Sequence, residues 1–414
     1  MAALVKAYTD LGRFSGTVLV ARGDRVLHCR GYGMADHEHR VPSTPATRYR
    51  IGSQTKAFTA MAVLRLAERG LLDITAPLDT VLPGYPGGDR ITPHHLLADT
   101  SGIPDYITTD AFTRTMALPR TTDELIATFK DRPPLFPPGE RMSYSNSGWV
   151  LLGAAIERIT GLPYGEHVHE HVLKPLGMTR SGLARPGEVL AGHAEGYVRD
   201  DAGIARVPYL DLSNAHAAGA LHATAEDMLR WVRGLRAHTV LSPRSTALLL
   251  DGPAYGFVLE HGRRTRLESS GGIPGFVSTT VQYPGDDLTV IVLSNLENTA
   301  HTAIEQALAA IAYGEPYEPP GAREFVRVDP EVFGAWTGRY VCSYLGRTSE
   351  MTVTAEGERL MIAVQGLART ELRPLSRTRY FARMKGEVEL TFVGEPAREI
   401  AMVWSGRPVT ARRV

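Results

Sequence analysis

Ser53 stands three residues before Lys56, at the start of an apolar segment. On a helix, residues i and i+3 share a face, so the lysine amine would reach the serine hydroxyl. A serine hydroxyl becomes a strong nucleophile when a base accepts its proton, and burial adapts a lysine to that role. We therefore expect Ser53 to be a covalent nucleophile and Lys56 its base. The alternative is a helix cap followed by a solvent-exposed lysine.

A tyrosine and an asparagine follow in the segment Tyr144-Ser145-Asn146, which precedes another apolar stretch. A phenol beside the serine can pass protons between the nucleophile, the leaving group and the lysine. The Asn146 amide can hold the lysine and exchange hydrogen bonds with a substrate amide. The alternative is an ordinary turn in which Ser145 or Asn146 caps the next helix.

A third segment, Ser269-Ser270-Gly271-Gly272, ends an expected strand. A strand edge beside the nucleophile can bind the substrate backbone, and a free N–H there can form an oxyanion hole with the Ser53 N–H. Gly271 and Gly272 allow the backbone to approach a ligand closely. Without the other two motifs, this segment would only indicate a glycine-rich turn.

The surrounding pattern predicts the elements that position these residues. Residues 15–33 form an expected hairpin with its turn at Gly23-Asp24, and a helix runs from Ser53 to Gly70. Residues 71–234 are expected to be mainly helical, with the clearest helices at 144–161 and 224–235. Strands are expected within 255–295, separated by the turns HGRR, GGIPG and GDD, followed by a helix at 300–313.

The chain has 414 residues, which is too long for one ordinary core. A segment rich in proline, glycine and charge, GEPYEPPGAREFVRVDP, predicts a boundary between residues 1–318 and residues 330–414. The second part alternates short strands and turns, which predicts a small antiparallel barrel or sandwich, with a barrel or lipocalin-like form expected. The expected fold class is α/β (α+β): an antiparallel sheet flanked by helices, a helical subdomain, and this C-terminal all-β unit.

The composition excludes several kinds of partner. The formal net charge is zero, so no nucleic-acid partner is expected. No apolar run approaches the ~18 residues of a membrane span, and the first residues lack a secretory core, so we expect a soluble, cytoplasmic chain. Cys29 and Cys342 fall in different expected units, so no disulfide is expected, and neither cysteine has metal-ligand spacing. No metal site and no cofactor are expected. The oligomeric state is left open.

Together these motifs resemble the serine β-lactamase and penicillin-binding-protein family, in particular class C β-lactamases, D-aminopeptidases and related esterases. Framing segments that resemble it include RYRIGSQTKAFTA, LLADTSGIPDY, FPPGERMSYSNSGWVLLG and SSGGIPGF, over roughly residues 10–312. The resemblance implies that Ser53 is acylated, Lys56 is the general base and Tyr144 is a proton shuttle. It also implies that Asn146 contacts lysine and substrate, and that Gly272 supplies the second oxyanion N–H.

Two positions depart from the family pattern. Relatives usually have Lys or His where this chain has Ser269, which bears on recognition of a substrate carboxylate. Many relatives have histidine where this chain has Asp99, and we expect that change to concern scaffold hydrogen bonds.

Other polar and aromatic groups are assigned simpler roles. His167 and His171 have metal-ligand spacing, but with His169 they are expected on a solvated helix. Three arginines are expected on a solvated hairpin: Arg263, Arg264, Arg266. If one of them folded over the site, it would replace the cation that relatives have in place of Ser269. Four aromatics are expected in the core rather than in a pocket: Trp149, Tyr209, Tyr255, Phe276.

Two hypotheses follow from these observations. The first is an enzyme in which a small-molecule or peptide ester or amide acylates Ser53, and water or another acceptor removes the acyl group. Esterase, D-amino-acid peptidase or amidase, and biosynthetic transacylase all remain open. The second is a catalytically inactive binding or scaffold protein that keeps the fold.

Overall fold

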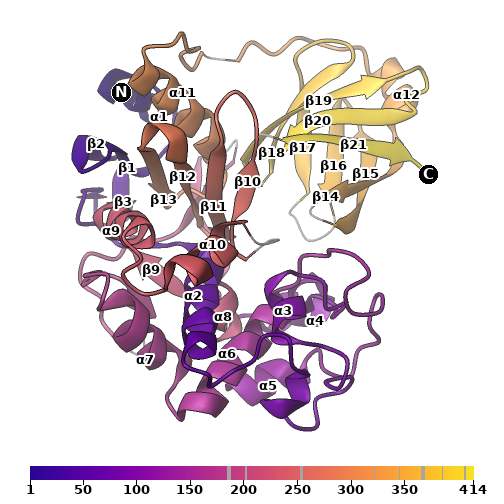
Figure 1. The fold of residues 1–414 in the computed structure, drawn as a ribbon. Coiled ribbons are helices and arrows are strands. Elements are labelled where there is room, and N and C mark those ends of the chain that lie inside the picture. Colours follow the sequence, from indigo (N-terminus) through magenta and orange to yellow (C-terminus); the bar gives the residue numbers. More distant parts are fainter. Residues whose placement is uncertain are drawn as a thin grey trace.

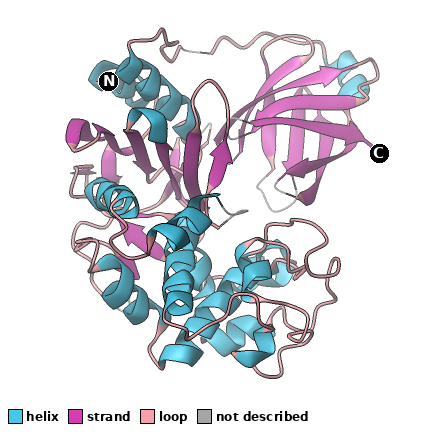
Figure 2. Ribbon diagram, in the orientation of Figure 1, coloured by secondary structure: helices cyan, strands magenta, loops and turns pink. Residues whose placement is uncertain are grey.

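The computed structural model describes residues 1–183, 188–200, 203–251, 255–321, 323–344, 346–364, 369–384, 386–404 and 407–414. Figure 1 shows three regions: a sheet with helices on it, a helical region beside the sheet, and a barrel at the C-terminal end. The mixed architecture predicted from the sequence is confirmed, including the small all-β unit (Figure 2).

The central sheet is antiparallel and has the strand order β10-β11-β12-β13-β1-β2. Its strands are β1 (Gly16–Arg22), β2 (Arg25–Tyr32), β10 (Val258–Glu260), β11 (Arg266–Ile273), β12 (Phe276–Tyr283) and β13 (Leu288–Ser294). The predicted 15–33 hairpin and the late strands are therefore confirmed. One detail of the sequence interpretation is wrong: GGIPG is not wholly a turn, because β11 continues through Gly271 and Gly272 to Ile273.

Both faces of the sheet are covered, which is why its strands are apolar along most of their length. One face packs against α1 (Ala2–Asp10) and α11 (His301–Tyr313), with Val5 and Leu308 in the shared core. The opposite face packs against α2 (Thr55–Glu68) and α9 (Ala225–Arg236). Thr224 caps α9 by accepting from the Asp227 N–H, as its sequence predicted.

The helical region contains short helices around the long helix α6 (Asn146–Thr160). The others are α3 (Pro93–Leu97), α4 (Asp110–Thr115), α5 (Thr122–Ala127), α7 (Tyr164–Val168), α8 (His216–Gly219) and, beside the sheet, α10 (Pro243–Asp251). Short strands complete this part: β3 (Met34–Asp36), β4 (Val41–Pro42), β5 (Tyr49–Arg50), β6 (Gly182–Leu183), β7 (Tyr197–Arg199), β8 (Ile204–Arg206) and β9 (Leu221–Ala223). Among the described residues, no helix has both the length and the hydropathy needed to cross a bilayer.

The C-terminal strands close into an antiparallel barrel with its own core around Tyr340 and Leu390. A short helix, α12 (Phe333–Trp336), precedes it. The strands are β14 (Gly338–Tyr344), β15 (Arg347–Glu356), β16 (Arg359–Val364), β17 (Thr370–Pro374), β18 (Arg379–Met384), β19 (Gly386–Val393), β20 (Glu399–Trp404) and β21 (Arg407–Arg413). Independent folding of the two predicted domains stays a prediction.

The barrel contacts the rest of the chain at specific points. Arg13 donates to Glu387 with an Nε–Oε1 distance of 2.7 Å, and Arg407 pairs with Glu260 at 3.1 Å. Gly346, just before β15, lies so close to Met142 that a Cβ on it would stand 2.1 Å from the Met142 carbonyl oxygen. The barrel is thereby held beside the segment that contains Tyr144.

Candidate active site

Ser53 lies in a 3₁₀ turn, Gly52–Gln54, that leads directly into α2. Gly52 has φ +53°, and a Cβ there would lie 2.9 Å from the Gly272 nitrogen. A Cβ on Gly271 would lie 2.0 Å from the Ile51 carbonyl oxygen and 2.6 Å from the Ser53 nitrogen. Both glycines are needed because the start of α2 and strand β11 approach backbone to backbone.

A buried polar contact fixes this turn against the sheet. The Gln54 side chain donates to Ser278 Oγ at 2.7 Å, and Ser278 Oγ donates to the Ile51 carbonyl oxygen at 2.8 Å. Ser278 belongs to β12, so Ser53 is held between two neighbouring residues that are both tied to the sheet. These contacts fix the backbone around the nucleophile, which helps to keep it aligned for reaction.

Lys56 is 2% exposed, so the alternative of a solvent-exposed lysine is wrong. Its Nζ lies 3.0 Å from Ser53 Oγ, 2.8 Å from Asn146 Oδ1 and 2.7 Å from the Ala218 carbonyl oxygen. The last two atoms only accept hydrogen bonds, so they take two of the amine hydrogens. In the neutral amine the remaining position is a lone pair directed at the Ser53 hydroxyl, the arrangement a general base requires.

The Tyr144 hydroxyl lies 2.7 Å from Ser53 Oγ, and Lys56 Nζ lies 4.8 Å from the centre of the tyrosine ring. Burial raises the pKa of the Tyr144 phenol, its hydrogen bond with Ser53 lowers it, and the Asp99 charge raises it, with a net upward shift. The phenol therefore stays protonated near neutral pH and can donate a proton. The structure brings Ser53, Lys56 and Tyr144 into direct contact.

Asp99 fixes the segment that contains Tyr144. It adopts φ +53°, and its carboxylate accepts from the Ser145 N–H at 3.1 Å and from Trp149 Nε1 at 3.2 Å. The expectation that Asp99 makes scaffold hydrogen bonds is confirmed. Ser145 occupies the position before α6 without a side-chain capping bond, so the simple capping alternative is not observed for it.

Asn146 is oriented by a residue that the sequence interpretation did not single out. Its Nδ2 donates to Asp105 Oδ2 at 3.0 Å, so its Oδ1 must face Lys56. Asp105 is 6% exposed and lies in the segment TSGIPDY. The Ala218 carbonyl, supplied by α8, was also missed, because a backbone acceptor leaves no mark in the sequence.

Strand β11 presents an open backbone edge to the site. Strand β10 pairs only with Arg266, Leu267 and Glu268, so in the described residues no strand covers this edge of β11 beyond Glu268, while β12 pairs with the opposite edge. Ser270, Gly271 and Gly272 line the cavity beside Ser53. Ser269 is 1% exposed and donates to the Gly256 carbonyl oxygen at 3.0 Å, and it does not line the cavity.

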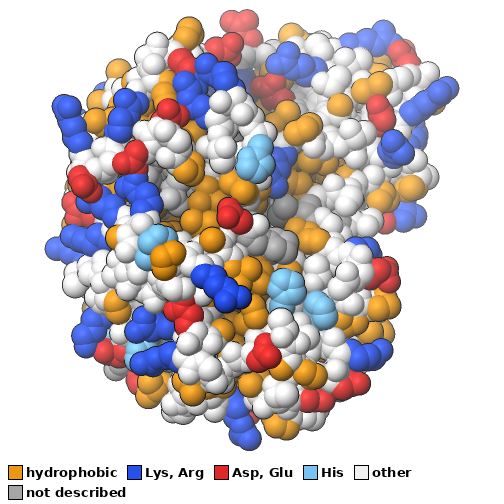
Figure 3. Space-filling model, in the orientation of Figure 1, with side chains coloured by type: hydrophobic (Ala, Val, Ile, Leu, Met, Phe, Trp, Pro, Cys, Tyr) orange, Lys and Arg blue, Asp and Glu red, His pale blue; other side chains and the backbone are white. Residues whose placement is uncertain are grey.

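The cavity has a volume of about 280 Å³ and extends from Ser53 and Tyr144 to Tyr344 and Trp404 of the barrel. Figure 3 shows hydrophobic side chains gathered in the hollow at the centre of this face. Phe276, expected to be core, is 2% exposed yet also lines the cavity.

Several expectations for other residues need correction. His167 is 2% exposed, so it does not lie on a solvated face, and burial lowers its pKa to about 4. Among the described residues, no three or more His, Cys, Asp or Glu side chains are grouped so that they could hold a metal ion. Arg266 is not on a solvated hairpin: it is partly buried and forms ion pairs with Glu268 and Glu305, whose charges it compensates. Tyr209 is 61% exposed rather than core.

The remaining expectations agree with the structure. Trp149 and Tyr255 are buried in the core, and Cys29 and Cys342 are both free. Arg263 is exposed and, like Arg264, bonds to Glu315.

Residues 1–315 match the Beta-lactamase family. The chain belongs to the β-lactamase family. This family member is 29% identical to penicillin-binding protein 4* of Bacillus subtilis (strain 168), over 97% of this chain and 95% of the relative. It is also similar to the crystal structure of a penicillin-binding protein from Bacillus halodurans, with 29% identity, a TM-score of 0.68, and coverage of 74% of this chain and 98% of the other.

A third comparison shows likeness of fold. The crystal structure of D-amino acid amidase from Ochrobactrum anthropi SV3 has a TM-score of 0.67 and 22% identity, covering 75% of this chain and 97% of the amidase. The family membership and the contacts at Ser53 both fit serine hydrolase chemistry.

Proposed function

We propose that this protein is a serine hydrolase or acyltransferase that forms an acyl-enzyme on Ser53 from an ester or amide. The central observation is that one oxygen, Ser53 Oγ, lies within hydrogen-bond distance of both Lys56 Nζ and Tyr144 Oη. Two proton-transfer groups on one hydroxyl provide the base for attack and the acid for the leaving group.

In the proposed reaction, neutral Lys56 accepts the Ser53 proton as Oγ attacks the substrate carbonyl. The developing oxyanion accepts hydrogen bonds from the backbone N–H groups of Ser53 and Gly272, which the close approach of Gly52 and Gly272 brings together. Tyr144 donates its proton to the leaving alcohol or amine and regains one from Lys56. Water then attacks the acyl-enzyme by the reverse route, or a second acceptor takes the acyl group.

The substrate backbone would bind along the open edge of β11, as an added strand. Asn146, whose Oδ1 holds Lys56, is the side chain that would contact a substrate amide. The D-amino acid amidase with the same fold favours an amide or peptide containing a D-amino acid as one candidate, and a short ester is the other. A biosynthetic acyl transfer uses the same intermediate with a different acceptor.

The competing hypothesis is an inactive binding or scaffold protein. An inactive protein has no reason to retain a buried lysine on the nucleophile, since burying an amine without a role costs stability. The test is burst kinetics with p-nitrophenyl acetate on wild type, Ser53→Ala and the exposed control Ser242→Ala. A burst in wild type and Ser242→Ala, but not in Ser53→Ala, supports the enzyme; equal rates in all three proteins contradict it.

A further inference from the structure

The cavity extends beyond the nucleophile, over the face of the sheet that α11 covers. Glu268 and Ser270 alternate with Ser269 on β11, so they point to this face. Glu297 follows β13, and His301 is the first residue of α11. All four line the same cavity as Ser53.

The acidic groups of this outer half differ in how their charge is compensated. Glu268 pairs with Arg266 at 2.6 Å. Glu297 accepts a hydrogen bond from the Gly275 N–H at 3.1 Å through one oxygen, and within the described ranges it forms no ion pair. Among the same residues the second oxygen of Glu297 accepts no hydrogen bond, so it is left as an acceptor for a ligand.

His301 adds a second acceptor and is 8% exposed. Its Nδ1 lies 3.2 Å from the Thr299 carbonyl oxygen, so this nitrogen holds the hydrogen and Nε2 holds a lone pair. Nε2 has no hydrogen-bond partner among the residues that the structure describes. Burial lowers the pKa of His301, so the ring stays neutral and Nε2 stays an acceptor.

The cavity is short of positive charge. Lys56 is the only lysine or arginine among the described lining residues, against three carboxylates: Asp99, Glu268, Glu297. Arg263 and Arg264 bond to Glu315. Arg266 bonds to Glu268 but does not itself line the cavity. A ligand that supplied N–H donors and positive charge would satisfy the unpaired acceptors.

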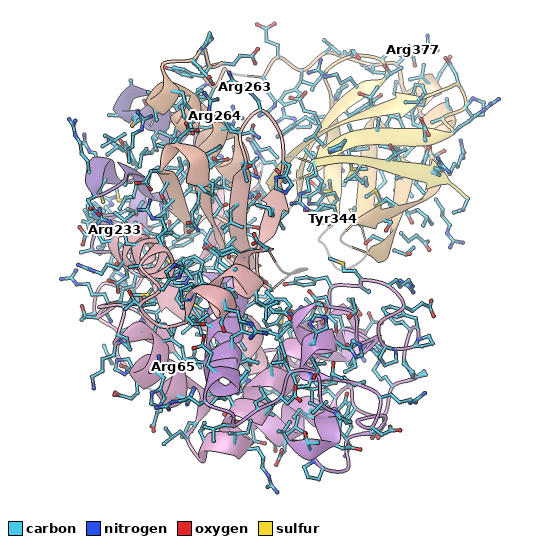
Figure 4. All side chains as sticks on the ribbon, viewed as in Figure 1. Arg65, Arg233, Arg263, Arg264, Tyr344 and Arg377 are labelled. Atoms are coloured by element: carbon cyan, nitrogen blue, oxygen red, sulfur yellow. The ribbon has the colours of Figure 1, made fainter. Side chains whose placement is uncertain are left out.

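The barrel contributes an aromatic wall. Tyr344 and Trp404 line the cavity with ring centres 6.2 Å apart, and Arg407, at the start of β21, forms an ion pair with Glu260. Figure 4 places Tyr344 at the end of the barrel that faces the catalytic region. Aromatic faces attract ammonium groups within about 6 Å, so this wall also favours a cationic ligand.

We propose that this cavity selects acyl donors that bear a protonated amine, with the ammonium group bound by Glu297 and His301. This inference rests on the proposed function and names its substrate class. Gly275, which bonds to Glu297, lies in the turn between β11 and β12, three residues beyond Gly272, so the two glycines are at most about 10 Å apart. We therefore place the amine several bonds from the reacting carbonyl.

The test compares two esters of equal shape, p-nitrophenyl ε-aminocaproate and p-nitrophenyl heptanoate, in which an ammonium replaces a methyl group. We expect wild type to prefer the amino ester by about tenfold or more in kcat/KM, because a charge-assisted hydrogen bond is gained. In Glu297→Gln the preference falls toward one. The matched control Glu315→Gln, a carboxylate that bonds to Arg263 and Arg264, keeps the wild-type preference.

The outcomes separate this inference from the function on which it rests. If both esters acylate Ser53 and wild type shows no preference for the amine, the inference is wrong and the proposed function stands. If neither ester acylates Ser53, both are contradicted. A preference that survives in Glu297→Gln at full size also overturns the inference, since the amine then binds elsewhere.

Discussion

The Asp105 carboxylate accepts a hydrogen bond from the Asn146 amide nitrogen at 3.0 Å. This contact decides which end of the amide meets Lys56, because an amide that flipped would direct N–H groups at the lysine amine. Asp105 acts through Asn146 as a positioning residue.

We expect Asp105→Ala to lower kcat by about 10- to 100-fold, since a buried hydrogen bond to a charged group contributes ~1.5–3 kcal/mol. Asp105→Asn, which still offers an acceptor oxygen, should restore much of that loss. The double variant Asp105→Ala/Asn146→Ala should be no slower than Asn146→Ala alone. Steady-state kinetics check this, and fully additive losses would show that Asp105 acts elsewhere.

Lys56 and Tyr144 should act as one unit with Ser53. Lys56→Ala and Tyr144→Phe are each expected to reduce the acylation rate by orders of magnitude, because both side chains contact the same hydroxyl. The double variant should be little slower than the worse single one, as cooperating groups are not additive. Stopped-flow measurement of the acylation burst checks this, and independent losses would contradict a shared proton path.

Ser269 predicts poor turnover of β-lactams. Its hydroxyl already donates to the Gly256 carbonyl oxygen, so it offers no cation to a substrate carboxylate. The arginines that could have replaced that cation are all paired with carboxylates: Arg263, Arg264, Arg266. We expect kcat/KM to be lower for a chromogenic cephalosporin than for a p-nitrophenyl ester. A clear preference for the cephalosporin would mean that a positive group reaches the site.

Buried histidines predict loss of stability in mild acid. Burial lowers the pKa of His222 to about 3, and its Nδ1 is buried without a hydrogen-bond partner. Between pH 6.5 and 3 the unfolded chain binds a proton here that the folded chain does not, so the free energy of unfolding falls on acidification.

This single group should remove about 2 kcal/mol between pH 7 and pH 5, since each pH unit below 6.5 is worth ~1.4 kcal/mol. Urea unfolding at both pH values measures it. His222→Gln should show a smaller decline than wild type, whereas His169→Gln, at an exposed position, should match wild type. An equal decline in all three proteins would locate the acid sensitivity elsewhere.

The parts of the site that could be predicted from sequence are those set by local geometry. The Ser53–Lys56 contact follows from helical spacing, and the late strands follow from their apolar patterns and turns. The Tyr144 and Gly271 positions needed the resemblance to known relatives, because nothing local brings them to Ser53.

Other features depend on contacts between distant segments. The Ala218 carbonyl reaches Lys56, and Asp105 reaches Asn146, only after segments far apart in the sequence pack around α2. His167 looked solvated because its segment is polar, yet the fold buries it. Tyr344 comes from the barrel, and no sequence pattern indicates which turn of a barrel will face a cavity.

The most direct test of the central claim is peptide mapping by mass spectrometry after exposure of the folded protein to a fluorophosphonate. The account predicts one covalent adduct, located on Ser53, that is absent in Ser53→Ala and formed much more slowly in Lys56→Ala. A folded wild-type protein that stays unlabelled would contradict it. So would an adduct on another residue that forms equally fast in wild type and in Ser53→Ala.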